Sequence, residues 1–158
     1  MKNYNFIAIG DTVIDAFIKL KEAEIQTYGG KSKICMRFAD KIPYEDVFIV
    51  PAVGNSANVA VSAARLGITS ALVANIGDDY FGKECLDVFT AEGVGTEFIT
   101  SHKGKKTNYH YVLWYGSDRT ILVKHETYQY TLPNIRTPSW IYLSSLGENS
   151  LDFHKQIE

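Results

Sequence analysis

The sequence has 158 residues, of which 46% are hydrophobic and 22% are charged, and its formal net charge is −2. This composition excludes a disordered chain, and the near-neutral charge excludes the strongly basic surface that is typical of nucleic-acid binding. No apolar run approaches the roughly 20 residues that span a bilayer, and the N-terminus reaches a polar loop too early for a secretory signal. We therefore expect one soluble, cytoplasmic domain in which Cys35 and Cys85 are free, buried thiols.

The first half of the chain predicts two strands, a hairpin and a helix. An apolar run over residues 4–10 indicates a buried strand, and a hairpin is expected to turn at Gly29-Gly30. Residues 45–54 contain a β stretch that Pro51 is expected to end. An alanine-rich helix should follow from about Ser56 to Leu66, where Gly67 stops it.

The second half of the chain first continues the alternation of strands and helices and then changes to a hairpin. Residues 69–77 predict a buried strand, and a helix should follow from Asp78 or Asp79 to Glu92. Period-two alternation over 107–125 predicts a hairpin, after which residues 138–147 predict a strand and Asn149 or Ser150 should cap a last helix. A parallel sheet covered by helices, with an additional β flap, is therefore the expected α/β architecture.

The start of the helix predicted over 56–66 combines a glycine with two amides. Its alanines favour close packing against a sheet, but they do not explain Gly54, Asn55 and Asn58. A glycine lets backbone approach a ligand, and amide side chains both donate and accept hydrogen bonds. N-capping is the favoured interpretation of Asn55 or Ser56 alone, whereas Asn58 lies past the cap, where asparagine is a mediocre helix former. The set predicts a ligand rich in hydroxyl groups.

Asp15 interrupts an apolar stretch that runs from Val13 to Ile18. Spacing alone allows an exposed strand residue or a buried acceptor with a function, and Asp11 could simply cap a turn. Ligands of open α/β sheets bind at the carboxyl ends of the strands, and Asp15 lies just past such an end, which favours a functional role. The pair Asp78-Asp79 has no matching carboxylates or histidines, so we expect a helix cap there and no metal site.

Three motifs in this order resemble the N-terminal half of the ribokinase-like sugar kinases, also called PfkB carbohydrate kinases. The first motif is Gly10 with Asp15. The other two consist of Gly54, Asn58 and Ala60, and of Gly77, Asp79 and Gly82. The resemblance implies a three-layer α/β/α sheet with a small β lid, over residues 1–158, whose lid strands cover about 13–50 and 107–124. It also implies that this chain holds the N-terminal half of the fold, without the C-terminal ATP-binding half.

The resemblance also implies a function and a set of contacts. Family members transfer the γ-phosphate of ATP to a hydroxyl group of a sugar or nucleoside, with Mg²⁺ and an aspartate base. Asp15, Gly54, Asn55 and Asn58 correspond to sugar-binding residues, whereas the motif from Gly77 to Gly82 corresponds to a structural turn. The resemblance implies no catalytic, cofactor-binding or metal residue in this chain, and a homodimer through the β lid is the expected partner besides the sugar.

The sequence departs from the family pattern at three places. Val53 replaces the first glycine of the family's Gly-Gly pair, and the region of Ser144 and Gly147 lacks the sugar-binding glutamate of some members, which puts ribose specificity in doubt. The C-terminal Asp-Thr-x-Gly-Ala-Gly-Asp motif is not found, so we expect the chain alone to be inactive. The alternatives are a non-catalytic sugar-binding or oligomerisation module, and an unrelated α/β enzyme.

Overall fold

A computed structural model describes residues 3–157, which divide into two compact units. The first unit contains residues 3–14, 51–109 and 124–157, and the second contains Asp15–Val50 and His110–Val123. The second unit is thus built from two excursions of the chain out of the first. A lid function for the second unit stays a prediction.

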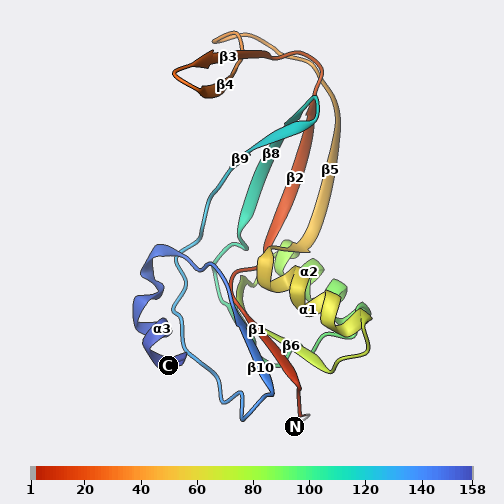
Figure 1. The fold of residues 1–158 in the computed structure, drawn as a ribbon, viewed down its shortest axis with the longest axis vertical. Helices are drawn as coiled ribbons and strands as arrows, with labels where there is room; N and C mark the ends of the chain where they lie inside the picture. Colours follow the sequence, from red (N-terminus) through yellow and green to blue (C-terminus); the bar gives the residue numbers. More distant parts are fainter. Residues whose placement is uncertain (1–2, 158) are drawn as a thin grey trace. The chain divides into compact units, whose positions relative to one another are not determined.

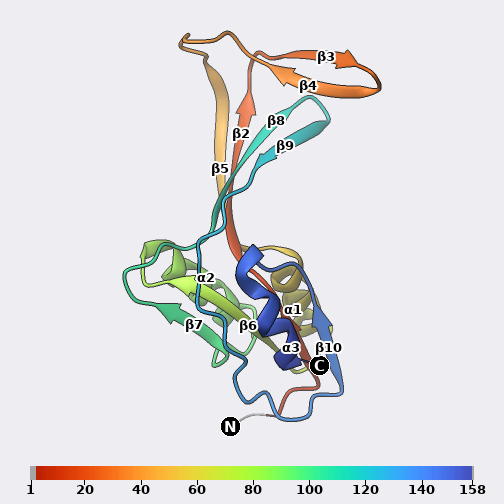
Figure 2. The same ribbon diagram turned by 90° about the vertical axis from the view of Figure 1, so that its left-hand side faces the viewer.

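The first unit is built on a parallel sheet with the order β10-β1-β6-β7 (Figure 2). Its inner strands β1 (Phe6–Ile9) and β6 (Ser70–Gly77) are apolar and almost fully buried, as expected of parallel strands covered on both faces. The outer strands are β10 (Trp140–Leu143), which pairs with β1, and β7 (Ile99–His102), which pairs with β6 from Ala74 onward. Strand β7 escaped sequence prediction because it is short and its side chains are polar or only half-buried.

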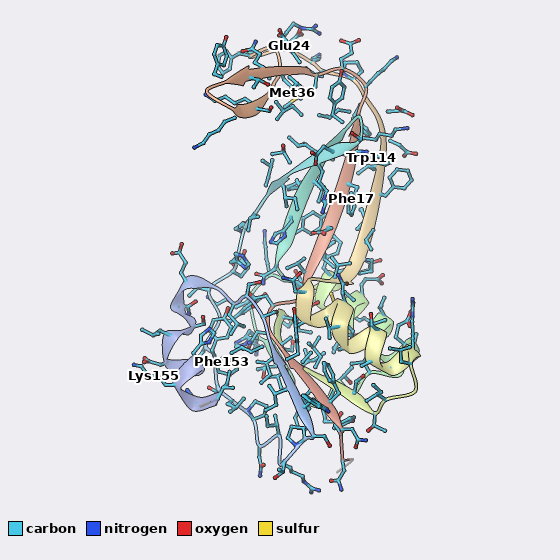
Figure 3. The ribbon with its side chains drawn as sticks, viewed as in Figure 1. Phe17, Glu24, Met36, Trp114, Phe153 and Lys155 are labelled. Atoms are coloured by element: carbon cyan, nitrogen blue, oxygen red, sulfur yellow. The ribbon has the colours of Figure 1, made fainter. Side chains whose placement is uncertain are left out.

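Helices cover both faces of this sheet (Figure 1). Helices α1 (Asn55–Arg65) and α2 (Tyr80–Ala91) bury Ala57, Ala60 and Phe89 against one face. Helix α3 (Leu151–Ile157) buries Phe153 against the other face, together with Ile7 and Ile9 of β1, whereas Lys155 points away from the sheet (Figure 3). The three-layer α/β/α fold class is therefore confirmed.

The small side chains of α1 let this helix lie close to the sheet. Ala57 and Ala60 are fully buried against Ala8, Leu72 and Ala74, so their lack of bulk is explained by packing. The helix ends as predicted, with a glycine in the left-handed conformation at residue 67. None of the helices in the described part of the chain is long and apolar enough to cross a membrane.

The second unit contains an antiparallel hairpin and a separate four-stranded sheet. The hairpin consists of β3 (Glu24–Tyr28) and β4 (Lys31–Cys35), and it turns at Gly29-Gly30 as predicted. The sheet has the order β5-β2-β8-β9, and its strands are β2 (Val13–Leu20), β5 (Tyr44–Val53), β8 (Tyr109–Tyr115) and β9 (Asp118–Leu122). The terminal residues of β2, β5 and β8 extend into the first unit.

Two local expectations were wrong, and a third was resolved between its alternatives. Strand β5 continues through Pro51 to Val53, which a proline allows because β5 lies at the edge of its sheet. Cys35 is half-buried rather than buried, because it ends the exposed strand β4. A 3₁₀ turn, Glu148–Ser150, precedes α3, so that Ser150, one of the two residues expected at the cap, directly precedes the helix. The side chain of Asn149 instead donates to the carbonyl of Tyr128 at 2.8 Å.

Asp79 caps α2 and fastens the loop between β7 and β8 to it. Its carboxylate accepts hydrogen bonds from the backbone of Gly82 at 2.9 Å and from the hydroxyl of Thr107 at 2.6 Å. A Cβ atom on Gly77 would lie 2.4 Å from the carbonyl oxygen of Lys105, and one on Gly82 would lie 2.2 Å from that of Gly77. The motif from Gly77 to Gly82 therefore has a packing explanation.

We expect Asp79→Ala to destabilise the first unit by about 2 kcal/mol, because it removes the N-cap and leaves two backbone donors without their acceptor. Burial raises the pKa of Asp79, but the hydrogen bonds from Thr107 and Gly82 outweigh it, so the pKa is lowered overall. The stabilisation that the ionised Asp79 gives to the folded state is therefore fully present above the unfolded-state pKa, and it is lost as the pH falls through the folded-state pKa. Urea unfolding at neutral and acid pH measures it, and an equal effect of the substitution at both pH values would contradict it.

Candidate functional site

The carboxyl ends of β1 and β10 form a topological switch point in the first unit. The chain passes from β1 through α1 to β6 on one side, whereas β10 lies on the other side of β1 and leads to α3 on the opposite face. Loops diverge at such a point, and ligands of open α/β sheets bind in the crevice outside it. The residues that follow these two strands, and the start of α1, are therefore the candidate site.

Gly10 and Asp11 connect the two strand ends to α1. The backbone N–H of Asp11 donates to the carbonyl of Ser145 at 3.1 Å, and its own carbonyl accepts a hydrogen bond from the hydroxyl of Ser56 at 3.0 Å. A Cβ atom on Gly10 would lie 2.3 Å from the Ser144 hydroxyl oxygen and 2.9 Å from that of Ser56, so a larger residue here would force both serine side chains to move. The region of Ser144 and Ser145, which lacks the glutamate of some family members, thus lies directly beside β1.

The loop that enters α1 has an unusual backbone. Ala52 is buried and adopts a left-handed conformation with φ 61°, which is uncommon for a residue with a side chain. Gly54 has φ 117°, and a Cβ atom there would lie 2.8 Å from the carbonyl oxygen of Asp11. Val53, between them, ends β5, and its carbonyl accepts a hydrogen bond from the hydroxyl of Thr12 at 3.3 Å. Gly54 therefore lets the start of α1 approach the end of β1.

Gly54 itself is the N-cap of α1, so the interpretation of Asn55 or Ser56 as the cap is wrong. The hydroxyl of Ser56 is used instead to bind the carbonyl of Asp11. Asn55 and Asn58 are exposed, and their side-chain amides make no hydrogen bond with any residue from 3 to 157. The first turn of the helix thus presents two amides together with backbone N–H groups that have no acceptor within the helix.

The carboxylate of Asp11 is buried at the same place, which the sequence did not predict. Its Oδ2 lies 3.2 Å from Nδ1 of His125, and its Oδ1 accepts a hydrogen bond from the Tyr130 hydroxyl at 3.4 Å. Burial raises the pKa of Asp11, although His125 and Tyr130 act in the opposite direction. Its partners are more than 100 residues away along the chain, so no local pattern could have identified this cluster.

Asp15 forms a separate cluster, in the second unit. It lies on β2, and its Oδ1 is 3.6 Å from Nδ1 of His110 on the neighbouring strand β8. Burial raises the pKa of Asp15, whereas the positive charges of His110 and Arg119 lower it, and the net direction is upward. Two of the four histidines of the sequence, His110 and His125, thus lie against carboxylates.

The described residues offer hydrogen-bond donors and acceptors but no cluster of metal ligands. No group of three or more His, Cys, Asp or Glu side chains that could hold a metal ion is found within residues 3–157. These residues therefore do not fit a Mg²⁺ site, whereas the exposed amides of Asn55 and Asn58 and the two carboxylates provide donors and acceptors for hydroxyl groups.

Known proteins share this fold and parts of this sequence. The ribokinase of Bacillus subtilis is 38% identical over 73 residues, which are 45% of this chain and 25% of that protein. The fructokinase of Vibrio alginolyticus is 37% identical over 70 residues, which are 44% of this chain and 23% of that protein. The matched segment thus spans about a quarter of each of these relatives.

Solved structures show the fold. Arabidopsis thaliana ribokinase complexed with ribose and ATP matches 78% of this chain and 36% of its own, with a TM-score of 0.62 and 17% identity. Halothermothrix orenii fructokinase matches 77% of this chain and 37% of its own, with a TM-score of 0.53 and 24% identity. A family model described as "pfkB family carbohydrate kinase" matches residues 19–146, which are most of the sequence. The chain therefore belongs to the PfkB carbohydrate kinase family.

Proposed function

We propose that this chain supplies the sugar-binding part of an ATP-dependent kinase that phosphorylates a hydroxyl group of a sugar or nucleoside. Its relatives are named ribokinase and fructokinase, and the Arabidopsis ribokinase structure contains both ribose and ATP. In phosphoryl transfer, the protein contributes chiefly by positioning the acceptor and by stabilising charge. The chain's contribution is the positioning of the acceptor hydroxyl.

The observation that carries this proposal is the start of α1 at the switch point. Gly54 brings the helix N-terminus against the end of β1, and Asn55 and Asn58 present exposed amides there that no residue of the chain engages. Amides can bind both the oxygen and the hydrogen of a hydroxyl group, as a sugar requires. We assign sugar contacts to Gly54, Asn55 and Asn58, and to Asp15 as the carboxylate that accepts hydrogen bonds from hydroxyl groups.

We place the base, the ATP site and the Mg²⁺ site outside the described residues. The sequence contains no Asp-Thr-x-Gly-Ala-Gly-Asp motif, and the described residues gather no metal-binding cluster. The chain alone is therefore expected to bind sugar without transferring phosphate from ATP. A measurable rate of sugar phosphorylation by the purified chain would contradict this assignment.

A homodimer through the second unit is also proposed. Strand β5 lies at the edge of its sheet, and its residues Val47, Phe48 and Ile49 are 42–53% exposed. Exposed apolar edge strands favour pairing with another chain. This surface equally supports the alternative of a non-catalytic sugar-binding or oligomerisation module. Light scattering that compares the molar mass of Phe48→Lys with that of the unmodified chain tests whether the surface forms a dimer.

The sugar assignment is tested by calorimetric titration of the chain with ribose, fructose and a nucleoside, followed by the best ligand with Asn58→Ala. We expect Asn58→Ala to weaken binding about tenfold, because one or two hydrogen bonds to hydroxyl groups are lost from an exposed side chain. Ser62→Ala is the matched control on the same helix, because Ser62 is exposed and bonds only to its own helix backbone. Equal affinities of Asn58→Ala and the unmodified chain would remove Asn58 from the site.

A further inference from the structure

Asp15 has a buried oxygen with too few hydrogen bonds. Its Oδ1 is buried and accepts no hydrogen bond from any residue between 3 and 157, although the side chain as a whole is 21% exposed. A buried acceptor without a donor is costly, and a buried carboxylate is costlier unless a positive charge lies near. The position therefore needs a positive charge beside Oδ1 to keep the carboxylate ionised.

His110 is the nearest group that can supply the positive charge. Its Nδ1 lies 3.6 Å from Asp15 Oδ1, which is an ion-pair distance but longer than a direct hydrogen bond, and its side chain is 12% exposed. It lies on β8, which neighbours β2 in the sheet, so the two side chains come from rigid elements. A histidine is a cation when both of its ring nitrogens are protonated.

The other charged groups around Asp15 are farther away or already paired. Arg119, on β9, also lowers the pKa of Asp15, but β9 is separated from β2 by β8. Lys19 lies on the same face of β2 as Asp15, since the two are four residues apart, and it bonds to Glu45 of β5 at 2.6 Å. Lys19 also lies over the ring of Trp114, 5.5 Å from its centre, so its charge has two partners other than Asp15.

We propose that His110 is a positioning residue of the sugar site, which holds the Asp15 carboxylate ionised and oriented through the buried Oδ1, so that the other oxygen, Oδ2, accepts a hydrogen bond from a sugar hydroxyl. This rests on the proposed function, because it requires Asp15 to bind the sugar. The proposal also means that the pH dependence of sugar affinity is set by His110 on the neighbouring strand β8 as well as by Asp15.

The sign of the pH effect follows from the burial of Asp15. Burial already raises the pKa of this carboxyl group, and His110 is the largest influence that lowers it. Removing the positive charge of His110 therefore raises the pKa of Asp15 further, so that the carboxylate is protonated at a higher pH than in the unmodified chain. Sugar binding needs the ionised carboxylate as a hydrogen-bond acceptor. As the pH is lowered, the variant without the His110 charge therefore loses sugar binding at a higher pH than the unmodified chain does.

The test measures sugar affinity against pH, and the titration of the Asp15 carboxyl carbon by NMR, in the full chain. We expect His110→Asn to weaken sugar binding about tenfold at pH 6 and to move both the acid limb of binding and the Asp15 titration to higher pH. Arg119→Gln should move them in the same direction by less, because Arg119 is the smaller of the two influences. His154→Asn, on α3, is the control and should change neither.

Identical binding profiles and identical Asp15 titrations in His110→Asn and the unmodified chain would overturn the proposal, as would a larger shift from Arg119→Gln. Asp15→Asn separates this failure from that of the proposed function. If Asp15→Asn binds sugar as tightly as the unmodified chain, Asp15 is not a sugar contact. If Asp15→Asn loses binding and His110→Asn keeps it, only the role of His110 fails. Should His110→Asn fail to fold, His110→Gln provides the same two measurements.

Discussion

Replacing Gly54 by alanine should abolish detectable sugar binding while leaving most of the chain folded. The backbone of Gly54 has φ 117°, a region that residues with a Cβ atom avoid, at a cost of about 1–3 kcal/mol. The new Cβ would also lie 2.8 Å from the carbonyl oxygen of Asp11, which belongs to the backbone and cannot turn aside. The loop must therefore shift, and the start of α1 moves with it. We expect at least a hundredfold loss of affinity by calorimetry.

Gly67→Ala is the matched control for this substitution. Gly67 lies just past the other end of α1 and also has a positive φ of 81°, but a Cβ atom there would meet nothing within 4 Å. The control therefore carries backbone strain of a similar kind without a steric clash and without disturbing the switch point. We expect it to lower the free energy of unfolding by about 1 kcal/mol and to keep full sugar affinity. Equal losses of affinity in both variants would show that strain, and not position, explains the effect.

Replacing Asp15 by alanine should weaken sugar binding ten- to hundredfold. A hydrogen bond to a charged group contributes about 1.5–3 kcal/mol, and the substitution removes the carboxylate that we assign as its acceptor. In a complete kinase the same loss should appear in kcat/KM, because an acceptor hydroxyl that is poorly held reaches the transition state less often. Calorimetry on the chain and steady-state kinetics on a complete kinase measure the two quantities.

The control for Asp15 is Asp46→Ala on the neighbouring strand β5. Asp46 is exposed, and its carboxylate bonds only to the backbone of the next residue, so its loss should leave affinity unchanged. A folded Asp15→Ala variant with unchanged affinity would remove Asp15 from the site. It would leave the assignment of Asn55 and Asn58 intact, because those residues belong to the first unit and are tested separately.

The sequence was sufficient for most of the elements and for the fold class. Apolar runs that end in a glycine identified β1 and β6, and the alanine pattern with its closing glycine identified α1, because burial on both faces and helix caps leave local signals. It failed for β7, whose residues Ile99–His102 form a strand because β6 offers them hydrogen bonds and not because of their own pattern. Strand pairing is a tertiary effect in such cases.

The candidate site, like the fold, was predicted from the sequence only in part. The order and spacing of three motifs gave the resemblance to the PfkB sugar kinases, and that resemblance implied Asp15, Gly54, Asn55 and Asn58 as candidate contacts. Only the tertiary structure showed that Gly54 is the N-cap, that Asn55 and Asn58 keep exposed amides, and that His125 and His110 lie against Asp11 and Asp15. These pairings join residues about 95 to 114 positions apart, and the sheet topology that brings them together leaves no trace in any short stretch of sequence.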